Sequence, residues 1–303
     1  MNILIYGPGG IGGFLGAFLL KSDFQTFFLA RGDTYKILNR NGMALRSNLG
    51  DIQIRKLNVI NSLKKCPEVD IVILAVKLYD LNNSLEDLVA NARGDFVILP
   101  FQNGVIAEIL IRKKFGEEKT FGGVAQISSF LNENKEIIHN GNLASFFVGK
   151  MSTYSKYEKK IIKFSEEINN LGIDFRYSEK IKQKIWDKFI FLSAYSGVTT
   201  LSEMTIGEIF DDKYYKDLFV EAMQETLLLS KKFKINFNYN PINNWLERIH
   251  KMPKDLTSSM FLDFKKNKKL ELDWLSGYVT RLCDKYSISC EANKKILNGI
   301  KSK

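Results

Sequence analysis

The chain opens with the stretch N-I-L-I-Y-G-P-G-G-I-G-G at residues 2–13, and this stretch decides the fold of the first half. Its first five residues are mostly Ile and Leu, which predicts a buried strand. Glycines follow in the spacing G-x-G-x-x-G, at Gly7, Gly9 and Gly12, before a helix that we expect over 11–21. This strand, turn and helix order is typical of a dinucleotide-binding fold.

Each glycine of this turn has its own physical role. Gly7 allows the tight turn, Gly9 lets the backbone approach a pyrophosphate, and Gly12 allows the helix to pack closely on the strand. The N–H groups at the start of the helix, those of Gly10 and Ile11 among them, face the phosphates. The sequence therefore predicts a cofactor site here, with a glycine-rich structural turn as the alternative.

The end of the second strand indicates which dinucleotide binds. The strand expected at 26–30 is followed by Arg31, and an arginine there suits the 2′-phosphate of NADP, whereas an acidic residue would suit the ribose of NAD. Asp33 lies two residues further on and can instead cap the next helix. We therefore expect NADP (as NADPH) rather than NAD, with a plain surface arginine as the alternative reading of Arg31.

The remainder of the first half alternates short apolar runs with helical stretches. Together with the opening strand and helix, strands are predicted at 26–30, 70–76 and 96–100, and helices at 35–40, 81–91 and 105–114. Two hairpins are predicted, one from 43–46 with 51–57 and one from 127–131 with 136–139. The order predicts a doubly wound parallel sheet.

The pattern becomes helical near residue 178. After a helix at 158–170 and a strand at 174–177, helical spacing recurs at 181–195, 214–233, 242–249, 258–264 and 271–286. The predicted fold is an N-terminal Rossmann-type α/β domain over 1–178, which binds NADP, followed by an all-α C-terminal domain over 179–303, which holds substrate and catalytic residues.

Composition excludes several classes of protein. The 303 residues are 45% hydrophobic and 26% charged, which is ordinary for a soluble protein of two domains. Three cysteines without a CxxC pair and two histidines predict neither a disulfide framework nor a metal site. The net charge of +10 comes from scattered lysines, so no nucleic-acid partner is expected. With no apolar run of about 18 residues and no signal peptide, we expect a cytoplasmic protein without a membrane partner.

Two charged residues of the second half fall on apolar helical faces. Lys188 shares a stripe with Ile185 and Leu192, and burial there would lower its pKa, so that it can give a proton to an oxygen and take it back. The alternative is a lysine that snorkels to the domain edge. Glu271 is predicted to begin a new helix after the polar run 265–269, or to be an ordinary capping or solvated glutamate.

At these residues the chain resembles the ketopantoate reductases (2-dehydropantoate 2-reductases) of the 6-phosphogluconate-dehydrogenase-like superfamily. Besides the glycine turn, the motifs are L-A-V-K at 74–77, Q-N-G-V at 102–105, W-D-K at 186–188, S-S-M at 258–260 and L-E-L-D at 270–273. The resemblance runs the length of the chain. It implies NADPH-dependent reduction of a 2-oxo acid to a 2-hydroxy acid, on the way to pantothenate and coenzyme A, in a cleft between two domains.

The resemblance also implies a role for each matching residue. Lys188 is the general acid, and Asn103, Ser259 and Glu271 bind the substrate. Asn103 and Glu271 also contact the cofactor, Lys77 lies at the cofactor mouth, and Arg31 reads the 2′-phosphate.

Three positions depart from the family pattern. Asparagines commonly found four and eight residues after the lysine, and three before the serine, are Leu192, Ser196 and Leu256 here. Each lost hydrogen bond weakens binding of a hydroxylated substrate by about 1 kcal/mol. Ketopantoate is therefore the leading substrate and a bulkier or more apolar 2-oxo acid its competitor. A non-catalytic NADP(H)-binding sensor is the alternative class, and a monomer or homodimer is expected.

Overall fold

The computed structural model describes residues 1–303, which form two compact units. The first unit comprises Met1–Gln102 and Ala107–Ile181, and the second comprises Asn103–Ile106 and Lys182–Lys303. The boundary predicted at residue 178 lies close to the observed change of unit after Ile181, but the grouping of the segment 103–106 with the helices was not predicted. That segment contacts residues far along the chain, because a Cβ atom at Gly104 would lie 3.4 Å from the carbonyl oxygen of Trp274.

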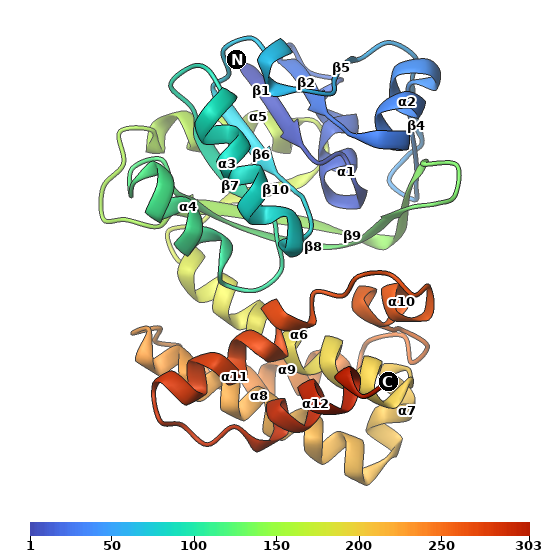
Figure 1. Ribbon diagram of the computed structural model, residues 1–303, viewed down its shortest axis with the longest axis vertical. Coiled ribbons are helices and arrows are strands. Elements are labelled where there is room, and N and C mark those ends of the chain that lie inside the picture. The colour runs from blue at the N-terminus through green and yellow to red at the C-terminus, as the bar shows by residue number, and fades with distance from the viewer. The chain divides into compact units, whose positions relative to one another are not determined.

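The first unit is built on a parallel five-stranded sheet in the order β5-β2-β1-β6-β7 (Figure 1). The strands are β1 (Asn2–Tyr6), β2 (Gln25–Leu29), β5 (Asn58–Ile60), β6 (Ile71–Leu74) and β7 (Val97–Pro100). Four of them confirm the predicted strands, whereas three-residue β5 is too short to show a pattern. In the register, Tyr6 pairs with Leu29 on one side and with Leu74 on the other. The carboxyl ends of these strands therefore lie at one edge of the sheet.

Helices of the first unit follow the strands in βα order. They are α1 (Gly10–Leu19), α2 (Gly32–Asn41), α3 (Leu81–Asn91), α4 (Ala107–Phe115) and α5 (Glu158–Asn170), with single 3-10 turns η1 (Leu63–Lys65) and η2 (Leu78–Asp80). The helices expected at 81–91 and 158–170 are observed with the predicted bounds. The first unit thus has the predicted Rossmann-type order.

A second sheet lies in the same unit. It consists of β3 (Met43–Ser47), β4 (Ile52–Ile54), β8 (Phe121–Leu131), β9 (Ile137–Lys150) and β10 (Asp174–Tyr177). Long strand β9 pairs with β8, β3 and β10. Both predicted hairpins are confirmed, although β8 and β9 are much longer than expected, because Gly122, Gly123 and the polar residues at 140–142 interrupt the apolar pattern within the strands.

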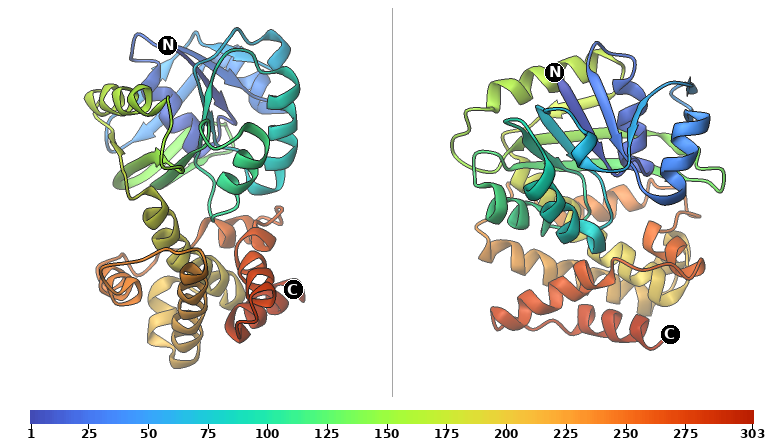
Figure 2. Two further views of the ribbon diagram at one scale, coloured as in Figure 1. Left: turned by 90° about the vertical axis from the view of Figure 1, so that its left-hand side faces the viewer. Right: turned by 45° about the horizontal axis from the view of Figure 1, so that its top comes forward.

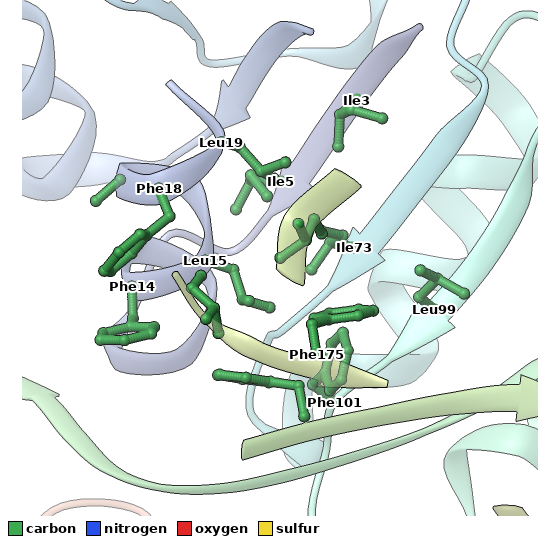
Figure 3. Close-up of a cluster of buried hydrophobic side chains, with 14 of the residues drawn as sticks. Ile3, Ile5, Phe14, Leu15, Phe18, Leu19, Ile73, Leu99, Phe101 and Phe175 are labelled. Carbon is green, nitrogen blue, oxygen red and sulfur yellow. The ribbon is translucent and has the colours of Figure 1, made fainter. Parts of the chain in front are cut away.

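Helix α1 joins the two sheets into one core. It contacts β1 and β2 of the parallel sheet and also β3, β8 and β9 of the second sheet. Its Phe14 ring lies 5.9 Å from that of Phe146 on β9, and Phe146 in turn contacts Phe101 at 5.7 Å. Figure 3 shows Phe14, Phe101 and Phe175 among the buried side chains of this cluster. The glycine turn that precedes α1 is thus anchored in the core.

The second unit is helical throughout (Figure 2). Its elements are α6 (Ile181–Ser202), α7 (Ile206–Asp211), α8 (Lys213–Lys232), α9 (Pro241–Ile249), α10 (Ser259–Lys265), η3 (Leu272–Trp274), α11 (Ser276–Lys285) and α12 (Glu291–Lys301). The sequence analysis missed α7 and α12. It also joined η3 and α11 into one helix. None of these helices is both long and apolar enough to cross a membrane.

Helix α6 is the central helix of this unit. Ile181 and Ile185 of the predicted stripe are buried, but Phe189, Ile190 and Val198 on its other sides are fully buried as well. The single apolar stripe that the sequence analysis expected is therefore only part of what this helix buries. From Ile185 onward most residues of α6 are buried, so Lys188 lies in a largely buried part of the helix.

Candidate active site

The glycine turn after β1 has a geometry that only glycine tolerates at two of its positions. Gly7 has a φ of +93°, in the left-handed region, and a Cβ atom there would lie 2.8 Å from Cγ1 of Val76. At Gly12 a Cβ atom would lie 2.4 Å from the carbonyl oxygen of Gly7. The turn and the close packing of α1 on the strand follow directly from these two glycines.

Gly9 and Gly10 differ in their surroundings. A Cβ atom at Gly9 would meet nothing within 4 Å, whereas one at Gly10 would lie 2.2 Å from the backbone oxygen of Ser129 on β8. The sequence analysis did not foresee that contact, since the two residues are far apart in the chain. Open space at Gly9 is what a diphosphate needs in order to approach the backbone.

The first turn of α1 supplies donors for an anion. Helix geometry leaves the N–H groups of Gly10, Ile11 and Gly12 without an acceptor inside the helix, while the Gly13 N–H donates to Gly9 O at 2.7 Å. No side chain caps this end of the helix. The donors, the positive end of the helix dipole and the open space fit a dinucleotide diphosphate.

Arg31 lies directly before α2, at the edge of the sheet where β1 also ends. Its Nη2 donates to the hydroxyl of Tyr6 at 3.0 Å and to Oδ2 of Asp87 at 2.9 Å. The Arg31 side chain is 62% exposed. Its guanidinium is held by two partners, Tyr6 and Asp87, that no local sequence pattern indicated.

Lys77 lies near the same edge, just after β6 and directly before η2. Its side chain is half-buried. The neighbouring Gln102, after β7, donates from Nε2 to the carbonyl oxygens of Leu74 and Val76 at 3.0 and 3.2 Å. These bonds fasten the ends of β6 and β7 to each other and hold the chain around Lys77.

Lys188 of α6 is half-buried, and its Nζ donates to Oδ1 of Asn103 at 3.0 Å. Burial lowers the pKa of Lys188 to about 8, although the Glu271 carboxylate acts in the opposite direction. The Lys188 amine is thus held at the Asn103 side chain. A lysine with this pKa can both donate and accept a proton near neutral pH.

Glu271 is buried, with 6% of its surface exposed. Helix α10 ends at Lys265, and Glu271 lies directly before η3, so the polar run does break the helix as predicted. The carbonyl oxygen of Glu271 accepts from the N–H groups of Trp274 and Leu275, while its side chain makes no capping hydrogen bond. The capping and solvated alternatives are therefore wrong.

The predicted substrate serine stands apart from this group. Ser259 is exposed in the first turn of α10 and makes no hydrogen bond to Asn103, Lys188 or Glu271. Its neighbour Ser258 is buried, accepts from the N–H of Phe261 at 3.1 Å, and pairs with the Thr199 hydroxyl at 2.7 Å. This hydroxyl pair ties α10 to α6 about three turns beyond Lys188.

The three positions that depart from the family pattern have different surroundings. Leu192 is half-buried, one turn beyond Lys188 on α6, and Ser196 is buried. Leu256 is 39% exposed. Leu192 is thus the departure closest in sequence to the lysine, and its apolar side chain cannot replace the amide hydrogen bonds of an asparagine.

Known proteins match this chain along nearly its full length. The family model described as "Ketopantoate reductase PanE/ApbA" matches residues 3–153, and the model of its C-terminal domain matches residues 180–303. A 2-dehydropantoate 2-reductase from Nostoc is 26% identical over 90% of this chain and 86% of its own length. An uncharacterized oxidoreductase, YkpB of Bacillus subtilis, is 25% identical over 95% of this chain and 94% of its own length.

Solved structures have the same fold. The 2-dehydropantoate 2-reductase of Geobacter metallireducens superposes with a TM-score of 0.91 at 21% identity, covering 100% of this chain and 99% of that one. A D-mandelate dehydrogenase in complex with NADH and anilino(oxo)acetate gives a TM-score of 0.88 at 18% identity, covering 100% and 97%. Since the two family models together account for most of the sequence, this chain belongs to the ketopantoate reductase family and is an oxidoreductase.

Proposed function

We propose that this protein reduces a 2-oxo acid to a 2-hydroxy acid with NADPH, and that 2-dehydropantoate (ketopantoate) is its substrate, reduced to pantoate for pantothenate and coenzyme A synthesis. The observation that carries the proposal is the half-buried Lys188, with a pKa of about 8 and its Nζ 3.0 Å from Asn103. A second support is the glycine turn with its open space at Gly9.

The first unit holds the cofactor in this proposal. The N–H groups of Gly10, Ile11 and Gly12 bind the diphosphate, Gly7 and Gly9 shape the turn, and Arg31 binds the 2′-phosphate. Lys77 contacts the cofactor near the end of β6. When bound, the nicotinamide dinucleotide supplies the hydride that the reduction needs.

The second unit supplies the proton and orients the substrate. The protonated amine of Lys188 gives a proton to the carbonyl oxygen of the 2-oxo acid, and this transfer neutralises the negative charge that develops there. Asn103 accepts a hydrogen bond from the amine and so directs one of its three protons. The buried Glu271 raises the pKa of Lys188 and opposes the effect of burial, which keeps the amine protonated near pH 7. Ser259 and Glu271 bind polar groups of the substrate.

The identity of the substrate depends on the apolar residues that this chain has where the family commonly has asparagine. With Leu192 in place of an amide one turn beyond Lys188, a hydroxylated substrate loses about 1 kcal/mol of binding per missing hydrogen bond. The relative crystallised with anilino(oxo)acetate is a D-mandelate dehydrogenase, so an aromatic oxo acid is accommodated by this fold in another protein. A more apolar 2-oxo acid is therefore the second candidate substrate.

The test is a panel of 2-oxo acids assayed with purified protein by the loss of NADPH absorbance, with NADH in parallel. We expect turnover of ketopantoate with NADPH at a higher kcat/KM than with NADH. A higher kcat/KM for an aromatic or branched 2-oxo acid would identify the second candidate. Binding of NADPH without turnover of any 2-oxo acid in the panel would refute the proposed reaction.

A further inference from the structure

A carboxylate lies against the arginine that we assign to the 2′-phosphate. Oδ2 of Asp87 on α3 accepts from the Tyr6 hydroxyl at 2.7 Å and from Nη2 of Arg31 at 2.9 Å. Its other oxygen, Oδ1, accepts from Nδ2 of Asn91 at 2.9 Å. Three donors, from Tyr6, Arg31 and Asn91, therefore hold the Asp87 carboxyl group in place.

This cluster lies where the adenosine end of a dinucleotide belongs. Tyr6 is the last residue of β1 and directly precedes Gly7, and Arg31 follows the neighbouring strand β2. In parallel α/β sheets, cofactors bind outside the carboxyl ends of the strands. Asp87 reaches the same place from α3, 56 residues beyond Arg31 in the chain.

The charges in the cluster have opposing effects on a 2′-phosphate. Arg31 attracts the phosphate, and only its Nη2 is engaged, so Nη1 and Nε keep donors for it. Asp87, whose Oδ2 lies 2.9 Å from Nη2 of Arg31, would repel a phosphate bound at that arginine. Because the Asp87 side chain is only 21% exposed, solvent screens this repulsion less than it would for a fully exposed pair.

We propose that Asp87 is a specificity-determining residue. It weakens binding of the 2′-phosphate, and so it reduces the ratio by which this protein prefers NADPH to NADH. The inference rests on the proposed function, in which Arg31 contacts the 2′-phosphate. An uncharged residue at position 87 keeps Arg31 available and removes the repulsion.

The experiment isolates the 2′-phosphate by calorimetry, with adenosine 2′,5′-bisphosphate and 5′-AMP as probes on the whole protein. Asp87→Asn binds the bisphosphate about three- to tenfold more tightly than wild type at low salt, and 5′-AMP within about twofold. The gain shrinks as salt rises above about 0.15 M, which a purely structural change would not produce. Asp87→Ser, a second uncharged variant, shows the same gain.

Two further variants serve as controls. Glu86→Gln removes a neighbouring carboxylate that is exposed and pairs with Lys114, and it leaves the binding of both probes unchanged. Arg31→Ala shows whether the arginine reads the phosphate at all.

The outcomes separate the two proposals. If Arg31→Ala binds the bisphosphate as well as wild type does, the assigned role of Arg31 is wrong. If Arg31→Ala loses that binding while both uncharged variants at position 87 bind the bisphosphate no better than wild type, the assignment of Asp87 is overturned and that of Arg31 stands.

Discussion

One amine on the central helix of the second unit carries the proposed chemistry. Lys188 lies between the buried residues Asp187 and Phe189 on α6, and its Nζ donates to the Asn103 side chain. Burial and the Glu271 carboxylate shift its pKa in opposite directions, and burial is the larger effect.

Replacing Lys188 with alanine removes the proton donor. Turnover of the 2-oxo acid should fall by about 10²–10⁴-fold, which is typical for loss of a positioned acid. Binding of NADPH, measured by fluorescence titration, should stay within about twofold, because the glycine turn and Arg31 belong to the other unit. A variant that turns over the true substrate normally would show that Lys188 is not the acid.

The pH dependence should have opposite signs in the two directions of the reaction. Reduction needs the protonated amine, so kcat/KM should decline as pH rises through the Lys188 pKa of about 8. Oxidation of the 2-hydroxy acid needs the neutral amine, so its kcat/KM should increase over the same range. Both pH profiles are measured with wild type and with Lys188→Ala. The variant should show neither the decline of kcat/KM for reduction nor the increase for oxidation around pH 8. If the variant shows the same pH dependence as wild type, another group is responsible for it.

Helix α1 sets the position of the proposed cofactor site, because both sheets contact this helix. Its first turn lies directly under β8, with no room for a side chain at Gly10, while the space beside Gly9 is open. The same short turn therefore contains one glycine needed for packing and another needed for ligand access. These requirements can be separated by experiment.

Alanine at Gly10 should mainly lower stability, whereas alanine at Gly9 should mainly weaken NADPH binding. Gly10→Ala should lower the free energy of unfolding by about 1–3 kcal/mol, since its Cβ would lie 2.2 Å from Ser129 O. Gly9→Ala should change stability by less than about 0.5 kcal/mol, because its φ of −83° suits alanine. We expect Gly9→Ala to weaken NADPH binding about tenfold or more, a loss of about 1.4 kcal/mol. Denaturant melts and titrations measure both, and equal destabilisation by the two variants would contradict this account.

At the scale of the whole molecule, the cofactor should stabilise the folded chain. NADPH at 100 times its Kd should add about 2.7 kcal/mol of stability, since it binds only the folded state. The melting temperature should therefore rise by several degrees in a thermal scan. Arg31→Ala at the same NADPH concentration should show a smaller rise, while its rise with NADH should equal that of wild type. An equal rise with NADPH in both proteins would remove Arg31 from the cofactor site.

The fold class was predictable from the sequence, and so were the residues of the proposed cofactor and substrate sites. Local patterns predict four of the five parallel strands, the glycine turn and the change to helices near residue 178. These patterns are local because the periodicity of a strand or helix, and the backbone conformation that requires glycine, involve only a few neighbouring residues. The polar run at 265–269 likewise predicts that the helix ends before Glu271.

Which side chains come into contact depends on the tertiary structure and could not be predicted from local sequence. Asn103 pairs with Lys188 across 85 residues, Tyr6 and Asp87 across 81, and Gly10 contacts Ser129 across 119. The short strand β5 acquires its identity from pairing with β2. No local pattern encodes such contacts, because they depend on how distant elements pack once each has buried its apolar side chains. Lys188, the proposed proton donor, could therefore be named from the sequence through its resemblance to the family, whereas the groups that set its pKa and those that hold Arg31 could not be derived from local pattern alone.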